Sequence, residues 1–208
     1  IVNMAAISGL DAVAVSDHNT VANVKAAIEA GKKCGVAVIP AMEVETAEEV
    51  HILTLYPTLD AADDAAKKVY AALPDIKNRP DIFGEQLIMD SEDNVVGYEE
   101  KLLISPTSLS LNELFNVVAD AGGLFIPAHV DRHSYSILTN LGFIPEELDI
   151  KNIEVSKHVE DLSAYLDDRQ DLKKYYIFRN SDAHYLENIS QKDAYLDCEN
   201  INDIFLRR

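Results

Sequence analysis

The sequence lacks several features that would assign the protein to a membrane or to a secreted class. No apolar run approaches the roughly 20 residues that cross a bilayer, and nothing at the N-terminus resembles a signal peptide. Two cysteines, Cys34 and Cys198, are too few for a disulfide framework or a four-cysteine zinc site. These absences favour a cytoplasmic protein without a membrane partner, because a reducing compartment suits unpaired thiols. They leave its oligomeric state open.

Basic residues are also scarce, with 18 Lys and Arg against 36 Asp and Glu, which gives a formal net charge of −18. A surface of this charge repels polyphosphate at long range, so we expect no binding to duplex nucleic acid and favour a small phosphorylated substrate. A bare acidic surface would also repel that substrate, unless divalent cations occupy the active site. Phosphate-binding and nucleophile-elbow glycine motifs are missing as well, so nucleotide-triphosphate and covalent serine chemistry have no support.

The chain length of 208 residues and the 48% share of hydrophobic residues predict a single α/β domain over residues 1–208. Short apolar runs typical of buried strands alternate with helical patterns. The runs are 10–15, 36–39, 124–127, 150–155 and 175–178, and the alternating stretch 51–56 is a further strand. The helical patterns include 21–33, capped by Asn19 or Thr20, 60–73, capped by Asp60, and 110–121, which the capping box of Ser110 and Glu113 opens. This alternation favours a mostly parallel sheet or barrel, with an irregular excursion at about 74–108. Functional groups are then expected beyond the carboxyl ends of the strands.

Three histidines follow such strands directly: His18, His129 and His184. A carboxylate stands close to two of them, since Asp17 precedes His18 and Asp182 precedes His184, and Glu43 ends a fourth apolar segment in the same way. Imidazole nitrogens and carboxylate oxygens suit Zn²⁺, Mn²⁺ or Fe²⁺. A cation would remove the cost of burying these groups together, so the pattern predicts a metal site.

Each of these residues also has a structural interpretation when it is taken alone. His18 could be a hydrogen-bonded or capping histidine, Asp17 could cap the helix that follows, and Glu43 could be a solvated loop acid. His51 begins its strand, so the strand-end rule does not select it. Recurrence of one ligand-rich pattern at four strand ends favours the metal site.

Four sequence blocks resemble the PHP (polymerase and histidinol phosphatase) family of metal-dependent phosphoesterases. They occur in the family's order: Ser-Asp-His-Asn at 16–19, Ile-Pro-Ala-Met-Glu at 39–43 with His-Ile-Leu at 51–53, Pro-Ala-His at 127–129, and Ser-Asp-Ala-His at 181–184. The resemblance implies a distorted seven-stranded (β/α) barrel of the TIM type and two or three divalent ions (Mn, Zn or Fe).

The resemblance also implies a role for individual residues. Glu43 would bridge two ions, and His51 and His129 would share the third. Asp182 would bind the first ion, and His184 and His18 the second. Asp17 is expected to orient an imidazole without binding metal itself. Arg132 could bind a substrate phosphate through its planar fork, or form a structural ion pair with a nearby acid.

One block of the family is absent, because the sequence contains no His-x-His. The family carries this pair on its first strand, so we expect that strand to be missing from this chain and to lie upstream of Ile1. The resulting hypothesis is hydrolysis of a small phosphoester by a metal-activated hydroxide. The substrate would be a nucleotide, a sugar or amino-alcohol phosphate, or a short oligonucleotide. The alternative is a non-catalytic metal- or ligand-binding module, and amide hydrolysis is a weaker rival because no activating lysine is evident.

Overall fold

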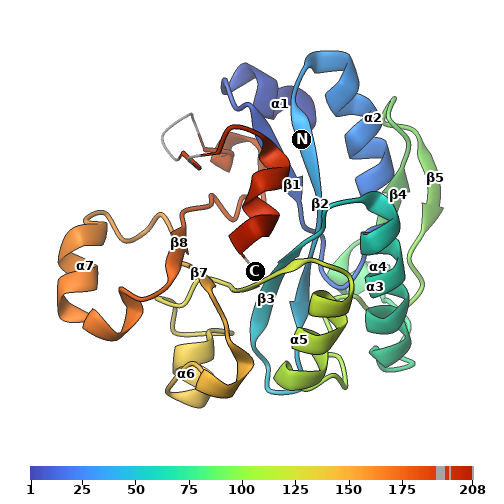
Figure 1. The fold of residues 1–208 in the computed structure, drawn as a ribbon. Helices are drawn as coiled ribbons and strands as arrows, with labels where there is room; N and C mark the ends of the chain where they lie inside the picture. Colours follow the sequence, from blue (N-terminus) through green and yellow to red (C-terminus); the bar gives the residue numbers. More distant parts are fainter. Residues whose placement is uncertain (191–194, 197, 208) are drawn as a thin grey trace.

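The computed structural model describes residues 1–190, 195–196 and 198–207, and a four-stranded sheet forms its centre (Figure 1). The strands lie in the order β1-β2-β3-β6. Their bounds are Ala12–Val15 for β1, Ala37–Glu45 for β2, His51–Leu55 for β3 and Leu124–Pro127 for β6.

Strand β3 runs antiparallel to both of its neighbours, in contrast to the mostly parallel sheet that the alternation of strands and helices predicts. β1 and β2 are parallel, whereas β3 is antiparallel to β2 and to β6. The connection between β2 and β3, residues 46–50, is too short for the crossover of a dozen or more residues that a parallel pair requires. The expectation of a mostly parallel sheet is therefore wrong for the strands around β3.

Two further strands extend this arrangement, but the described residues form no closed barrel. β7 (Asn152–Glu154) and β8 (Tyr176–Phe178) pair in parallel, and the Val130 N–H donates to the Glu154 carbonyl at 2.9 Å just beyond β6. A closed barrel needs a partner on both edges of every strand. Within the described ranges β1 and β8 are edge strands of their sheets, so the fold is mixed α/β and the expected seven-stranded barrel is not observed.

Three helices cover one face of the sheet (Figure 1). They are α2 (Val24–Cys34), α3 (Leu59–Ala72) and α5 (Leu111–Asp120), and they pack on the buried side chains of Met42, Val44 and Ile52. The capping box predicted at α5 is confirmed, since the Ser110 and Glu113 side chains and backbones bond reciprocally. Two predicted caps are wrong, because Thr58 caps α3 in place of Asp60, and Asn23 precedes α2 in place of Asn19 or Thr20.

The opposite face of the sheet is divided into an apolar and a polar part. Side chains alternate between faces along a strand, so Ala41, Glu43 and Glu45 share this face, as do His51, Leu53 and Leu55. The leucines pack against Ile204 and Phe205 of the 3₁₀ helix η4 (Ile201–Arg207). The acids and the histidine gather at the end of the sheet that η4 leaves uncovered.

The remaining elements are short. They are α1 (Val2–Ile7), α4 (Pro80–Phe83), β4 (Leu87–Met89), β5 (Val95–Tyr98), α6 (Ile137–Leu141), α7 (Leu162–Asp168) and the 3₁₀ turns η1 (Glu146–Leu148), η2 (Gln170–Leu172) and η3 (Leu186–Asn188). The stretch 74–108 therefore contains α4 and an antiparallel β4–β5 hairpin. None of the helices in the described ranges is both long and apolar enough to span a membrane.

Candidate metal centre

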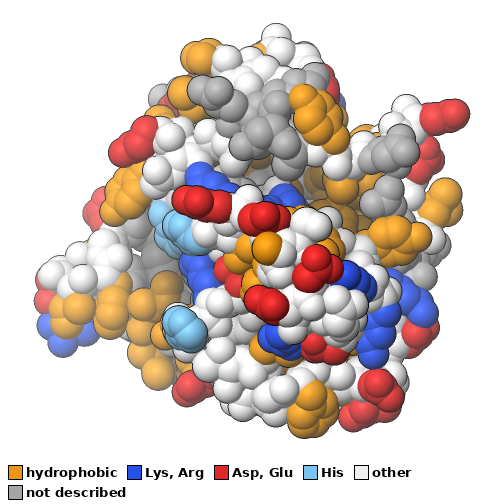
Figure 2. All heavy atoms as spheres, turned by 90° about the vertical axis from the view of Figure 1, so that its left-hand side faces the viewer, with side chains coloured by type: hydrophobic (Ala, Val, Ile, Leu, Met, Phe, Trp, Pro, Cys, Tyr) orange, Lys and Arg blue, Asp and Glu red, His pale blue; other side chains and the backbone are white. Residues whose placement is uncertain are grey.

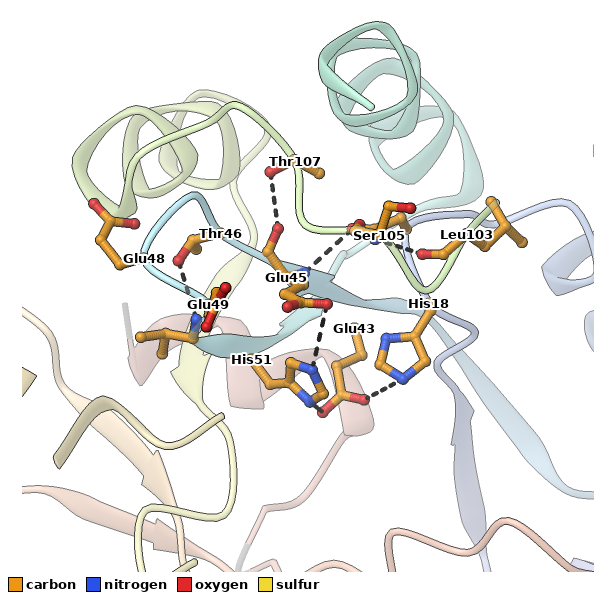
Figure 3. A network of polar contacts seen from close by, with 12 residues as sticks. His18, Glu43, Glu45, Thr46, Glu48, Glu49, His51, Leu103, Ser105 and Thr107 are labelled. Atoms are coloured by element: carbon orange, nitrogen blue, oxygen red, sulfur yellow. Dashed lines mark hydrogen bonds and ion pairs between the residues drawn. The ribbon is translucent and has the colours of Figure 1, made fainter. Parts of the chain in front are cut away.

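Glu43 lies at the centre of three imidazoles. Its Oε2 is 3.5 Å from His18 Nε2, and its Oε1 is 3.5 Å from His51 Nδ1 and 3.6 Å from His129 Nε2. Ligand atoms of His18, Glu43 and His51 all lie within 4.8 Å of one another. Figure 3 shows His18 and His51 on either side of the Glu43 carboxylate. The structure thus brings together four of the six predicted metal ligands.

Strand pairing explains how these residues meet. Pairing of the first two strands resumes beyond β1 as a parallel bridge between His18 and Glu43, and the Asn19 N–H donates to the Glu43 carbonyl at 2.8 Å. His51 is the first residue of β3, and His129 follows the last residue of β6. Because β3 is antiparallel to its neighbours, its beginning lies beside their ends.

The distances within the cluster suit a shared ion better than hydrogen bonds. An N–H···O bond spans about 2.9 Å. Two ligands at about 2.1 Å from a tetrahedral ion are about 3.4 Å apart, close to the observed separations. The second ring nitrogens of His18 and His129, both Nδ1, are buried without a hydrogen-bond partner. A donor set of imidazole nitrogen and carboxylate oxygen therefore fits Zn²⁺, Mn²⁺ or Fe²⁺.

The ionisation of the cluster reflects burial and close opposite charges. Burial raises the pKa of Glu43, but the imidazoles of His129 and His51 beside its carboxylate outweigh this effect and hold that pKa well below its usual range. Burial lowers the pKa of His51, but Glu43 and Glu45 outweigh it and raise that pKa to about 9. For His18, burial prevails and lowers the pKa. Without metal, the site therefore carries a partly buried carboxylate beside an imidazolium.

Two buried acids beside the cluster were not among the predicted ligands. Glu154 accepts the backbone N–H of His129 through Oε2 at 2.9 Å, and burial raises its pKa. Glu45 lies opposite His51 in the strand register, with its Oε2 3.9 Å from His51 Nε2. The alternation Glu-Val-Glu at 43–45 could have indicated Glu45 from the sequence, since residues two apart on a strand share a face.

Backbone strain gathers around the same site. Four residues other than glycine adopt left-handed φ values here, namely Asn19 at 54°, His129 at 32°, Tyr135 at 54° and Asp182 at 46°. The Tyr135 ring stacks on His51 with ring centroids 4.5 Å apart, and its carbonyl accepts the His51 N–H at 2.9 Å. Strain of this kind persists where the surrounding structure imposes it, as in binding and catalytic sites.

The last predicted block lies near the cluster without joining it. Asp182 and His184 line a cavity of about 810 Å³ together with His18, Glu43 and Glu154. Asp182 Oδ2, however, lies 2.9 Å from Arg132 Nη1, so the structure shows Arg132 in an ion pair. The His184 side chain is 66% exposed, and its Nδ1 is 3.0 Å from the Asp182 carbonyl. Among the described residues, the group of ligand atoms that lie within 4.8 Å of one another includes neither of them.

Asp17 contacts an amide and not the imidazole that we expect it to orient. Its Oδ2 accepts a hydrogen bond from Asn23 Nδ2 at 3.0 Å, at the start of α2. Among the described residues we find no hydrogen bond between this carboxylate and an imidazole. Asn23 directly precedes α2, so this hydrogen bond holds the short Asp17 side chain at the start of the helix. Asp17 still lines the cavity.

Comparison with known proteins gives structural similarity only, since neither a protein-family description nor a curated relative matches this sequence. Endonuclease Q from Pyrococcus furiosus is 19% identical with a TM-score of 0.61, covering 88% of this chain and 42% of that protein. Another Endonuclease Q structure, with a 27-mer duplex substrate carrying an abasic lesion, is 18% identical (TM-score 0.62; 89% of this chain, 43% of that one).

Two bacterial proteins are similar over nearly their whole length. A protein assigned as a metal-dependent phosphoesterase from Bifidobacterium adolescentis is 20% identical with a TM-score of 0.56, covering 92% of this chain and 86% of that one. An amidohydrolase from Chromobacterium violaceum is 16% identical with a TM-score of 0.55, covering 91% and 83%. The chain therefore shares its fold with these hydrolases, and it spans less than half the length of Endonuclease Q.

These structures overturn the expected partners. From net charge we expect a small phosphorylated substrate and no binding to duplex nucleic acid, yet Endonuclease Q, which has this fold, binds duplex DNA. Net charge describes the whole chain, whereas binding depends on the local field, in which bound cations are the largest charges. On the face in Figure 2, acidic side chains stand beside lysines, arginines and histidines and form no continuous acidic surface.

Proposed function

We propose that this chain is a metal-dependent hydrolase of phosphoester bonds. The observation that carries the proposal is the arrangement of three imidazoles around the partly buried Glu43 carboxylate, at separations of 3.5–3.6 Å that suit a shared ion. In this proposal His18, Glu43, His51 and His129 bind metal. Asp182 and His184, which line the same cavity, would add further ligands there.

Phosphodiesters of nucleic acid are the substrate class that we propose. The fold shared with Endonuclease Q supports this choice, and the cavity beside Glu43 is open to solvent through exposed residues such as His184. The chain spans 42% of Endonuclease Q. The length of nucleic acid that it contacts therefore does not follow from that longer protein.

Bound divalent ions would supply an acidified water and would offset the charge of the phosphate. The protein's own groups then have separate tasks. Glu43 keeps the three imidazoles around one carboxylate, and it carries the negative charge that attracts cations. Glu154 fixes the backbone of His129 through its N–H. Arg132 keeps its guanidinium beside the cavity through Asp182, where a planar fork of donors can bind phosphate oxygens.

The direct test is hydrolysis by the purified chain loaded with Mn²⁺ or Zn²⁺. The substrates are bis-(p-nitrophenyl) phosphate and a DNA duplex with one abasic site. We expect cleavage of a phosphodiester, and we expect His129→Ala and Asp182→Ala to lower its rate by orders of magnitude. His158→Ala and Asp64→Ala are matched controls, since both residues are exposed and lie outside the cavity.

An unchanged rate in both site variants would refute the mechanism. A metal-loaded chain that cleaves neither phosphodiester would favour the non-catalytic module. An amide substrate, a p-nitroanilide, is included because an amidohydrolase shares the fold. Cleavage of the amide alone would refute phosphoester hydrolysis and would favour amide hydrolysis.

A further inference from the structure

Glu45 is a buried acid that neither the sequence blocks nor the candidate ligand cluster include. It lies two residues beyond Glu43 on β2, so both carboxylates project from the same face of the sheet. The residue is only 5% exposed. In the antiparallel register of β2 and β3 it stands directly opposite His51 (Figure 3). A carboxylate with so little access to water needs a partner.

Two segments far from β2 in the sequence hold the backbone of Glu45 in place. Its N–H donates to Asn19 Oδ1 at 3.2 Å, and its carbonyl accepts from the N–H and the Oγ1 of Thr107 at 2.9 and 2.8 Å. The Asn19 side chain is itself anchored, because its Nδ2 donates to the carbonyls of Leu103 and Ser105. The position of the carboxylate therefore follows from the fold and does not depend on a flexible loop.

The two ring nitrogens of His51 face two different carboxylates. Nδ1 lies 3.5 Å from Glu43 Oε1, and Nε2 lies 3.9 Å from Glu45 Oε2. Tyr135 stacks on the ring with an interplanar angle of 14°, which limits its rotation. The ring therefore presents one nitrogen to the centre of the cluster and the other to Glu45.

We propose that Glu45 is a positioning residue of the metal centre, which holds the Nε2–H of His51 so that Nδ1 binds the ion. The inference rests on the proposed metal centre and adds a residue to it. A neutral imidazole that binds metal through Nδ1 must carry its proton on Nε2, and the carboxylate that faces this nitrogen is that of Glu45, with Oε2 at 3.9 Å. Such a carboxylate fixes the tautomer and the ring orientation, and it makes the imidazole a stronger ligand.

Metal titration of the chelator-treated full chain tests this role without reference to hydrolysis. We expect Glu45→Gln to weaken binding of Zn²⁺ and Co²⁺ by about 10–100-fold, measured by calorimetry, while the number of ions bound stays the same. Glu49→Gln is the matched control, because it removes the same charge at an exposed residue in the turn after β2. We expect it to bind like the unaltered protein.

Four results would overturn the inference. Equal affinity in Glu45→Gln and in the control would show that the carboxylate does not act on His51. Loss of one whole ion would make Glu45 a ligand. In case the variant does not fold, nitrogen NMR of the unaltered zinc-bound chain reports the tautomer of His51. We expect the proton on Nε2, and a proton on Nδ1 would refute the assignment. If the unaltered chain binds no divalent ion, the proposed function fails together with this inference.

Discussion

His51 Nδ1 lies 3.5 Å from Glu43 Oε1 although His51 begins its strand and Glu43 lies near the end of the preceding one. The two residues meet because β3 turns back along β2 after residues 46–50. This relationship supplies the centre of the candidate site, and most of the expected properties of the protein follow from it.

Replacing Glu43 tests the cluster directly. Glu43→Gln preserves the size of the side chain but removes the negative charge that the three imidazoles surround. We expect the bound metal, measured by elemental analysis, to fall sharply, and phosphodiester hydrolysis to fall by orders of magnitude. Glu29→Gln, at an exposed residue of α2, is the control for loss of one charge. Unaltered metal content in Glu43→Gln would contradict the role assigned to this carboxylate.

The stability of the metal-free protein is expected to depend on pH through His51. Its pKa rises from 6.5 to about 9 in the folded state, so the folded state favours the proton. The stabilising contribution is complete below about pH 6.5 and is lost as pH rises through about 9. Urea unfolding of the chelator-treated chain should therefore show a falling free energy of unfolding over this window. His51→Gln should flatten that part of the profile, and a slope that persists in the variant would assign the effect to another group.

Metal is expected to stabilise the fold, because the cluster is assembled only in the folded state. At a free ion concentration of 100 Kd, one site adds about 2.7 kcal/mol to the free energy of unfolding. Thermal unfolding with and without Zn²⁺ measures this effect as a rise in Tm. The rise should be smaller in His18→Ala than in His158→Ala, which removes an exposed histidine outside the cluster. Identical melting curves with and without metal would contradict the presence of the site.

Asn19 is expected to be essential for stability as well as for the site. Its buried side chain joins Leu103, Ser105 and Glu45 through three hydrogen bonds. Asn19→Ala leaves these groups unpaired, and each costs about 1–3 kcal/mol when buried. Denaturant unfolding should show a loss of at least about 2 kcal/mol. Asn140→Ala is the control, since Asn140 also donates to two carbonyls, those of Glu48 and Glu49, but is exposed. A comparable loss in both variants would mean that burial is not the cause.

Local signals predicted much of the fold and part of the site. The α5 capping box was predictable because Ser110 and Glu113 are three residues apart, and apolar runs indicated β1 and β6. The other helix caps could not be predicted, since several residues near each helix start could serve, and tertiary contacts select among them. Asn19 shows this plainly, because a residue suited to a cap is instead buried between β2 and the 103–105 segment.

The amino-acid sequence by itself determined the chemistry available to this protein: which imidazoles and carboxylates it has, and their order along alternating strands and helices. Only the tertiary structure decided which of them meet. It reversed β3, which brings His51 to Glu43 and Glu45, and it paired Asp182 with Arg132. The physical reason is that side-chain periodicity is encoded within a few neighbouring residues. Strand direction and ion pairing depend instead on partners far along the chain.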